Sequence, residues 1–387
     1  MSKSAVSEED MKISFYSNYL NHLQIPFCNE MYKLLGDDYK FIATEPMEEE
    51  RVKLGWSLSE DYPYEMRSYE NADTYNYCLN LGLESDVVIT GSAPGVFIKE
   101  RLKYNQLTFR YSERFFKKGV WRLINPRLLG SMLKNHTRYR NKNLYMLCVS
   151  AYTAHDVSLI GAYPNKTYKW GYFTEVKKYD VNELCENKNQ EPITLLWCGR
   201  FLDWKHPEKA VWVIKRLNEN GFDCMLNFIG DGPICEKIRN MVTILRLDDR
   251  IRFLGSMSPN KVREHMEKAN IYLFTSDRQE GWGAVLNESM NSGCAVVASQ
   301  AIGSVPFLIK HGENGFIYKN DDINDLYNKV EILVKDADLR KKLGANAVQT
   351  IEELWSPKVA AQRLVKFCNG LLNEEIIRFK DGPCSKA

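Results

Sequence analysis

Short apolar runs alternate with longer amphipathic segments along most of the chain. In the first half, the apolar runs that predict strands are residues 12–16, 39–44, 86–90 and 144–150. Residues 25–35 predict a helix that ends at Gly36. Strands separated by helix-length segments are typical of parallel βαβ units, so this pattern predicts an α/β region ending near Phe173.

The second half is more regular. Its predicted strands are residues 193–198, 225–229, 251–254, 271–275, 295–298 and 315–317. Its predicted helices are residues 208–218, 234–245, 259–269, 285–291, 323–334, 339–350 and 357–372. Six strands with helices between them indicate a doubly wound sheet. The polar tail from Arg378 is expected to fray.

The chain of 387 residues is too long for one ordinary domain and suits two. The polar stretch 175–192 is predicted to be a linker. The sequence therefore predicts an N-terminal Rossmann-like domain over 1–174 and a C-terminal one over 193–356. Residues 357–387 are predicted to form a helix followed by the polar tail.

Composition and charge narrow the class of protein. The chain is 44% hydrophobic and 26% charged, which excludes a disordered protein, and its net charge of +2 disfavours a nucleic-acid-binding polycation. No apolar run approaches the length of a membrane helix, and residues 1–11 do not resemble a signal peptide, so we expect a cytoplasmic protein. Ten cysteines without C-x-x-C spacing predict reduced, buried thiols rather than a zinc site.

An acidic motif follows the predicted strand 271–275 directly. Its Glu280-Gly-Trp-Gly loop leads into the helix predicted over 285–291, and backbone N–H groups at such a junction suit an anion. Glu288 follows Glu280 by eight residues, at most ~12 Å along a helix axis. A nucleotide sugar has a similar reach from its sugar ring to its ribose. The alternative is an N-capping acid and a solvated helix glutamate.

Two further loops follow predicted strands of the same sheet. Arg200 and Lys205 follow strand 193–198, where their charges would stabilise a departing diphosphate; the alternative is a basic surface loop. Gly230 and Gly232 follow strand 225–229 and would permit close approach of the backbone to a ligand. The third glycine of a dinucleotide fingerprint is absent.

Taken in order, these motifs resemble the C-terminal half of retaining glycosyltransferases. The matching segments are Gly199-Arg200 with Lys205, 229–233, 252–255, 280–283 with Glu288, 295–298 and 314–316. The chain is similar to glycosyltransferase family 4, also called glycosyl transferases group 1. The match covers about 160 residues, from 193 to roughly 347. It implies the α/β GT-B fold, in which two Rossmann-like domains face a cleft and a C-terminal helix, here within 357–387, crosses back to the N-terminal domain.

The resemblance implies a role for each matching residue. Glu280 would hold the donor sugar's hydroxyls, Glu288 the ribose hydroxyls, and Arg200 with Lys205 the diphosphate. The implied donor site comprises Gly199, Arg200, Lys205, Gly230, Gly232, Arg252, Phe253, Leu254, Glu280, Gly281, Trp282, Gly283, Ala284 and Glu288. Glu280, Arg200 and Lys205 would be catalytic. No metal or cofactor is implied, because the one Asp-x-Asp sequence, 336–338, reads as a helix start.

The first half matches the family more loosely. The loop 17–24 lacks the glycine pair that the family often has there, and Ser112 stands where many members have histidine. We expect Asn21, His22 and Gln24 to lie at the carboxyl end of the first strand and to replace the missing backbone donors. The alternative is ordinary loop polarity, with His22 a structural histidine that is satisfied by local hydrogen bonds.

The segment 99–142 holds thirteen Lys or Arg against two Glu, interleaved with Phe, Trp and Leu. Such a pattern suits the anionic inner face of a membrane; the alternative is a basic surface over buried aromatics. Nucleic acid is disfavoured because the rest of the chain compensates the charge.

The function implied is transfer of a sugar, with retention, from a nucleoside diphosphate donor, UDP by family habit. The acceptor would be a carbohydrate or lipid-linked saccharide in cell-surface polysaccharide synthesis. The alternatives are a nucleotide-sugar epimerase on a similar fold and a non-catalytic nucleotide-sugar-binding relative.

Overall fold

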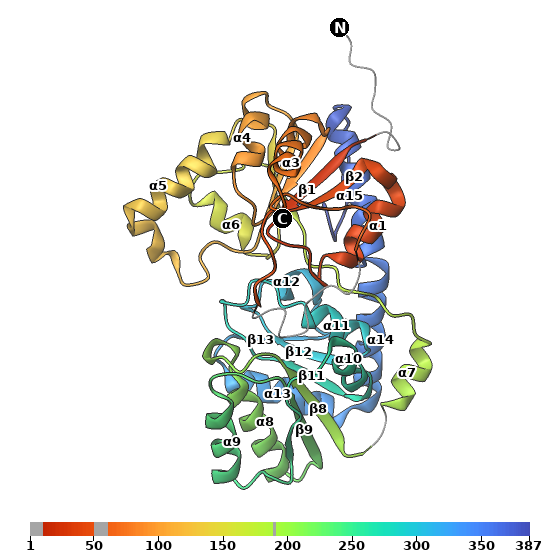
Figure 1. Ribbon diagram of the computed structural model, residues 1–387. Helices are drawn as coiled ribbons and strands as arrows, with labels where there is room; N and C mark the ends of the chain where they lie inside the picture. The colour runs from red at the N-terminus through yellow and green to blue at the C-terminus, as the bar shows by residue number, and fades with distance from the viewer. Residues whose placement is uncertain (1–10, 50–60, 189–190) are drawn as a thin grey trace. The chain divides into compact units, whose positions relative to one another are not determined.

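The computed structural model describes residues 11–49, 61–188 and 191–387, which form two compact units (Figure 1). Unit 1 consists of the described residues up to Glu175 together with Trp355–Ala387, and unit 2 of Val176–Leu354. Each unit is built around one parallel sheet.

The unit 1 sheet has seven strands in the order β3-β2-β1-β4-β5-β6-β7. They are β1 (Ile13–Ser17), β2 (Tyr39–Ala43), β3 (Glu65–Arg67), β4 (Val87–Thr90), β5 (Thr108–Ser112), β6 (Leu144–Cys148) and β7 (Thr167–Lys169). Phe15 in β1 pairs with Phe41 on one side and Ile89 on the other. Every residue of β1 is buried, as expected for a parallel strand covered on both faces.

Helices flank this sheet. They are α1 (Ile25–Leu35), α3 (Ala72–Glu84), α4 (Val96–Lys103), α5 (Pro126–Asn135), α6 (Thr153–Ser158) and α15 (Pro357–Leu372), with 3₁₀ turns η1 (Gly36–Asp38), η3 (Val120–Ile124) and η4 (Thr137–Tyr139). Although α15 is remote in sequence, it packs against α1 within unit 1. α15 begins where the Ser356 side chain accepts a hydrogen bond from the Val359 N–H.

Several described elements of unit 1 were not predicted from the sequence: β3, β5, β7, α3, α4, α5 and α6. Strand β5 alternates apolar positions with Arg110 and Ser112, so it shows no continuous apolar run. Helix α3 contains two Asn and two Tyr, and of its residues only Cys78 and Gly82 are buried. Its start is fixed by the Asn71 side chain, which accepts a hydrogen bond from the Thr74 N–H.

The expectation that the tail frays from Arg378 is wrong. Cys384 and Ser385 are buried, and the backbone of Lys169 in β7 donates to Ser385 O over 2.7 Å and accepts from the Cys384 N–H over 2.9 Å. The tail thus supplies backbone partners to β7. Its polar composition hid this because backbone hydrogen bonding requires no apolar side chain.

Arg101 of α4 joins the helix to the sheet through buried hydrogen bonds. Its side chain is fully buried and donates to the backbone carbonyls of Gly82 (3.0 Å), Ser85 (2.6 Å), Asp86 (2.6 Å) and Leu107 (2.7 Å). Desolvation lowers the pKa of Arg101 to about 10, so the guanidinium remains charged at neutral pH.

The unit 2 sheet has six strands in the order β10-β9-β8-β11-β12-β13, which confirms the expected doubly wound sheet. The strands are β8 (Ile193–Cys198), β9 (Cys224–Ile229), β10 (Ile251–Phe253), β11 (Ile271–Phe274), β12 (Ala295–Ser299) and β13 (Phe316–Tyr318). The helices are α7 (Val181–Asn187), α8 (Pro207–Glu219), α9 (Cys235–Ile244), α10 (Pro259–Lys268), α11 (Val285–Asn291), α12 (Val305–Leu308), α13 (Ile323–Lys335) and α14 (Ala337–Glu353), with 3₁₀ turn η5 (Asp203–Lys205).

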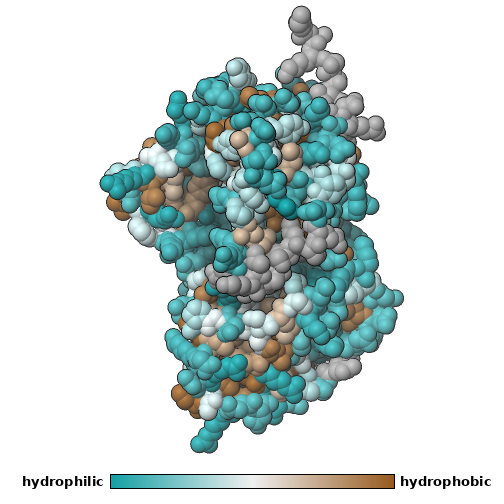
Figure 2. Space-filling view, in the orientation of Figure 1, coloured by the Kyte–Doolittle hydropathy of each residue, from teal (hydrophilic) through white to brown (hydrophobic). Residues whose placement is uncertain are grey.

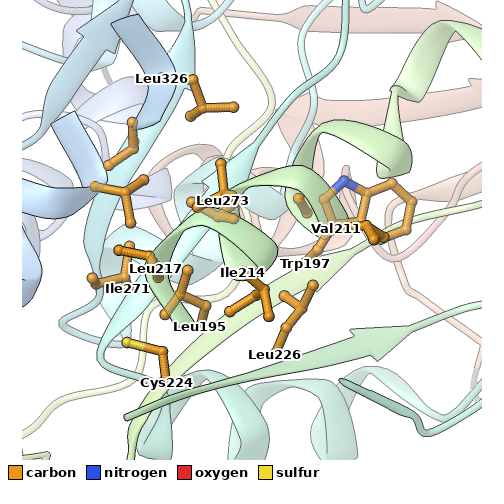
Figure 3. Packing of buried hydrophobic residues seen from close by; sticks show 14 of the residues in the cluster. Leu195, Trp197, Val211, Ile214, Leu217, Cys224, Leu226, Ile271, Leu273 and Leu326 are labelled. Carbon is orange, nitrogen blue, oxygen red and sulfur yellow. The ribbon is translucent and has the colours of Figure 1, made fainter. Parts of the chain in front are cut away.

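The core of unit 2 lies between this sheet and its helices. Figure 3 shows Ile214 and Leu217 of α8 facing Leu195 and Leu226 of the sheet, and all four side chains are fully buried. Full burial of such side chains stabilises the fold by roughly 1.5–3 kcal/mol each. All ten cysteines are free thiols, and nine of them are buried.

The segment 175–192, expected as a linker, contains α7. The Asp180 side chain caps this helix by accepting from the Asn182 and Glu183 N–H groups, and α7 packs on α14. Lys188 then donates to the carbonyls of Met266 (2.6 Å) and Ala269 (2.8 Å). Residues 189 and 190 lie outside the described residues.

We expect Arg101→Met to lower the free energy of unfolding by roughly 3–5 kcal/mol, because several buried carbonyls lose their donor. Lys103→Met is the matched control: Lys103 lies on the same helix but is exposed, and we expect it to change stability by less than about 0.5 kcal/mol. Chemical denaturation of the two variants measures the difference. Equal effects would contradict a structural role for Arg101.

Candidate functional site

The residues singled out in the second half gather where the unit 2 sheet reverses its order. β8 and β11 lie side by side, and the strands that follow each of them extend the sheet in opposite directions. Ligands of open parallel sheets bind beyond the carboxyl ends of the strands at such a reversal. The loop after β8 carries Arg200 and Lys205, and the loop after β11 carries Glu280.

Lys205 and Glu280 form an ion pair in the structure. The Nζ of Lys205 bonds Oε2 of Glu280, and the Ser276 hydroxyl donates to the same oxygen over 3.0 Å. Glu280 is only 8% exposed, and the Lys205 ammonium lies 4.7 Å from the centre of the Trp204 ring. Because both charges are largely removed from water, loss of either partner leaves a buried charge uncompensated.

Hydrogen bonds to the core hold these two loops together. The Thr275 hydroxyl donates to the backbone carbonyl of Lys205 over 2.7 Å and accepts from Trp197 Nε1 over 2.9 Å. The Asp277 N–H donates to the Trp204 carbonyl over 3.0 Å. Since Trp197 belongs to β8 and is buried, the position of Lys205 is set by the centre of the sheet.

The turn after Glu280 is shaped by glycine and tryptophan. Gly283 has φ +82°, and a Cβ there would lie 2.3 Å from the Phe274 ring. Trp282 is fully buried; its Nε1 donates to Asn287 Oδ1 over 2.9 Å and its carbonyl accepts from the Ser304 hydroxyl over 2.6 Å. The Trp282 side chain therefore anchors the turn, and any ligand contact from this turn would come from its backbone.

Glu288 stands on the first turn of α11 and is partly exposed. Desolvation raises the pKa of its carboxyl to about 7, and the charge of Arg263 partly offsets this effect. Arg263 donates to the backbone carbonyl of Glu288 over 3.1 Å and to Asn291 Oδ1 over 2.5 Å. A carboxyl with this pKa can both donate and accept hydrogen bonds near neutral pH, which suits a neutral diol.

The glycines after β8 and β9 serve the chain's own packing. A Cβ at Gly230 would lie 2.1 Å from the Gly199 carbonyl oxygen, and one at Gly232 would lie 2.6 Å from the Phe201 carbonyl oxygen. The sequence predicts close approach of this backbone to a ligand, whereas the close approach in the structure is between two loops. Glycine at these positions therefore has a structural reason that does not depend on a ligand.

The other expected donor contacts lie along the same end of the sheet. Arg200 is exposed in the loop after β8, and Ala284 lies directly before α11. Arg252, Phe253 and Leu254 belong to or follow β10, the edge strand, two strands away from β8.

In unit 1, most of the expected residues are engaged in local hydrogen bonds. Asn21 Nδ2 donates to Gln24 Oε1 over 3.0 Å, and the Leu23 N–H donates to Asn21 Oδ1 over 3.0 Å, so both side chains build the turn that begins α1. His22 is half-buried in that turn. Ser112 donates to the Glu113 carbonyl over 2.9 Å and lines a cavity of unit 1. Their contacts with an acceptor stay a prediction.

Ser276, Trp204 and Arg263 are neighbours of the site that sequence reasoning missed. Ser276 follows a predicted strand at the correct end of the sheet, so its position was a signal. Arg263 lies on α10 and reaches the site through packing, for which the sequence carries no local signal. Asp336, from the Asp-x-Asp sequence, caps α14 by accepting from the Leu339 N–H.

Two absences concern the part of the chain that the structure describes. Within residues 11–49, 61–188 and 191–387, no three His, Cys, Asp or Glu side chains are grouped so as to hold a metal ion. Within the same ranges, no helix has the length and apolar character that crossing a bilayer requires.

Sequence comparison finds similar proteins among known glycosyltransferases and related synthases. The chain is 26% identical over 206 residues to N-acetyl-alpha-D-glucosaminyl L-malate synthase of Bacillus anthracis, covering 51% of this chain and 53% of that one. It is 27% identical over 189 residues to the capsular polysaccharide biosynthesis glycosyltransferase CapM of Staphylococcus aureus, covering 46% of each chain. The chain thus spans about half the length of the curated relatives it matches.

Solved structures share the fold. The Anabaena HepE structure in complex with UDP aligns with a TM-score of 0.67 at 14% identity, covering 94% of this chain and 99% of that one. The sucrose-phosphate synthase of Thermosynechococcus elongatus aligns with a TM-score of 0.69 at 15% identity, covering 94% and 100%. The expected GT-B class, with two Rossmann-like parallel sheets flanked by helices, is confirmed.

The family described as "Glycosyl transferases group 1" matches residues 184–350, which include Arg200, Lys205, Glu280 and Glu288. The expected family resemblance is thereby confirmed for this part of the chain. Residues 184–350, which make up most of unit 2, are thus similar to the group 1 glycosyltransferases.

Proposed function

We propose that the protein is a retaining glycosyltransferase that moves a sugar from a nucleoside diphosphate donor to a saccharide or lipid-linked saccharide. The observation that carries this proposal is the partly buried Lys205–Glu280–Ser276 cluster at the strand reversal of unit 2. It lies within the residues that match the group 1 family.

In the proposed mechanism, the Lys205–Glu280 ion pair takes part in donor binding. A bound diphosphate would attract Lys205 and Arg200, and Glu280 would then be free to accept hydrogen bonds from the sugar's hydroxyls. As the bond from the anomeric carbon to phosphate breaks, negative charge develops on the diphosphate, which these cations stabilise. The acceptor oxygen forms its new bond on the same face of the sugar, and the departing phosphate takes the acceptor's proton. Two fixed cations supply the charge stabilisation that a metal ion would otherwise provide.

A uridine diphosphate donor is favoured by the solved relatives. HepE has been solved with UDP, with UDP and glucose, and with UDP-glucose. CapM, by its name, acts in capsular polysaccharide biosynthesis, which supports a role of this chain in polysaccharide assembly. An epimerase would instead convert the donor without an acceptor, and a non-catalytic relative would bind UDP without turnover.

Part of the basic region 99–142 has the character of a membrane contact. Trp121 and Ile124 of η3 are 59% and 82% exposed, and no residue of α5 is buried. Around α5, Figure 2 shows hydrophobic and hydrophilic side chains mixed on the surface. We therefore propose that η3 and α5 rest on an anionic membrane surface, with apolar side chains among the headgroups.

We expect Glu280→Gln and Lys205→Met each to lower the release of UDP from UDP-glucose by about 10²–10³-fold, because each removes a charge at the reacting centre. Glu208→Gln, a charge loss on the nearby helix α8, should keep the wild-type rate. Coupled detection of UDP measures all three variants. Full turnover in Glu280→Gln would refute the proposed mechanism, and conversion of the donor to its epimer would favour the epimerase.

We expect UDP at 100 times its dissociation constant to stabilise the protein by about 2.7 kcal/mol, and Glu288→Gln to weaken this thermal shift. The same variant tests the raised pKa of about 7. The folded protein holds a proton on Glu288 that the unfolded chain releases near pH 4.5, so stability is lost as pH rises from there through about 7.

Without UDP, Glu288→Gln should therefore be more stable than wild type at pH 8 by ~1–3 kcal/mol and no more stable at pH 4. Denaturation at both pH values measures this difference. Glu313→Gln, an exposed charge loss in unit 2, is the control and should show no such dependence. An equal pH dependence in wild type and Glu288→Gln would contradict the assignment.

For the membrane contact, we expect the protein to sediment with phosphatidylglycerol vesicles and not with phosphatidylcholine vesicles. The triple variant Lys118→Glu, Arg127→Glu and Lys134→Glu should lose this binding, since all three residues are exposed on the η3–α5 surface. A matched triple reversal in unit 2, at Lys237, Lys261 and Lys342, should bind as wild type. If both triple variants lose vesicle binding equally, the binding depends only on the net charge of the protein, which would contradict a specific membrane contact.

A further inference from the structure

Unit 1 contains a cavity of about 450 Å³ at the carboxyl ends of its strands β4, β5 and β6. Its lining comprises Thr90, Gly91, Ser92, Arg110, Tyr111, Ser112, Glu113, Arg114, Phe115, Lys117, His136, Met146 and Tyr172. The volume is in the range of small-ligand sites. All of these residues belong to unit 1, and none of them is among the residues proposed to bind the donor.

Arg110 is the unusual group in this lining. Its Nε is buried without a hydrogen-bond partner, and its guanidinium forms no ion pair with any residue that the structure describes. Neighbouring strands surround its backbone, because β5 pairs with β4 through Thr90 and with β6 through Met146. A cation in this position is held in the cavity by the sheet itself.

The other charges of the cavity are already matched. Glu113 pairs with Lys117 and accepts a hydrogen bond from the Tyr172 hydroxyl over 3.2 Å. Arg114 lies 3.7 Å from the buried carboxylate of Asp156. These pairs leave Arg110 as the uncompensated charge.

His136 adds no second charge to the cavity. Desolvation, together with the nearby charge of Arg110, lowers the pKa of His136 to about 3, so the ring is neutral at physiological pH. Its Nδ1 is hydrogen-bonded to the Tyr163 hydroxyl over 2.7 Å, and its ring packs edge-on against Phe115. The wall beside Arg110 is thus neutral and aromatic.

We propose that this cavity binds an anionic group of the acceptor, a carboxylate or a phosphate, through Arg110. The inference rests on the proposed transferase function and narrows its acceptor to a negatively charged compound. A guanidinium presents paired N–H donors that match the oxygens of either anion, and such pairs are strong where water is largely excluded. Tyr111 and Phe115 supply aromatic surface for the uncharged part of the same molecule.

The test uses the full chain and three probes at low ionic strength: inorganic phosphate, succinate and glucose. Calorimetric titration should detect binding of phosphate or succinate but not of neutral glucose. Arg110→Gln should weaken the anion's affinity at least tenfold, and Arg110→Lys should restore part of it, because the charge returns without the paired donors. The anion that binds more tightly distinguishes a phosphorylated acceptor from a carboxylate acceptor.

Phosphate could also bind the cations of the donor site, so Lys205→Met is run beside the Arg110 variants. Anion binding that survives in Lys205→Met and disappears in Arg110→Gln supports the proposal. The opposite pattern, or no anion binding at all, overturns it. Lys118→Gln, an exposed charge loss outside the cavity, is the matched control and should bind as wild type.

The readouts also separate this inference from the proposed function. UDP binding is proposed for unit 2, so it should be unchanged in Arg110→Gln, and chemical denaturation of this variant checks that unit 1 is folded. Absence of UDP binding in every variant would refute the transferase function and leave the anion site standing. Normal UDP binding with anion binding unaffected by Arg110→Gln would refute the anion site alone.

Discussion

The pairing of Lys205 with Glu280 is the contact on which the candidate site depends. It forms because β8 and β11 are neighbours in the sheet, with Leu195 opposite Ile271, so that the loops leaving them meet. Thr275 then fixes the carbonyl of Lys205, which sets the distance between the loops. Each charge offsets part of the free-energy cost of removing the other from water. The two loops are therefore held together by the same charges that the proposed diphosphate donor would engage.

The second half of the chain could be predicted closely because its apolar runs are short, regular and separated by helices. β8, α11 and α15 begin and end where the pattern placed them, and the loops carrying Lys205 and Glu280 followed from strand ends alone. Contacts made by packing could not be predicted. Arg263 reaches Glu288 from another helix, and the tail binds β7 through its backbone. Neither of these contacts produces a hydrophobic periodicity that the sequence would show.

A count of the charges in the basic region 99–142 does not show which of its cations are buried and which are exposed. The sequence treats its thirteen cations alike, whereas the structure separates them by surroundings. Arg101 is buried and donates hydrogen bonds to backbone carbonyl groups, whereas Arg110 lines a cavity. Lys118 and Lys134 are exposed beside apolar side chains. One stretch of like charge thus contributes separately to folding, to a ligand cavity and to the surface, and burial decides which.

The return of α15 to unit 1 has a consequence for synthesis of the protein. α1 leaves the ribosome early, but the helix that packs on it is made only after all of unit 2 has been translated. At about 5–20 residues per second, the delay is roughly a quarter of a minute to a minute. Unit 2 is complete in sequence by Leu354 and can fold during this time. The nascent chain therefore carries an uncovered apolar face on α1 throughout that interval, and it is there that a chaperone would be needed most.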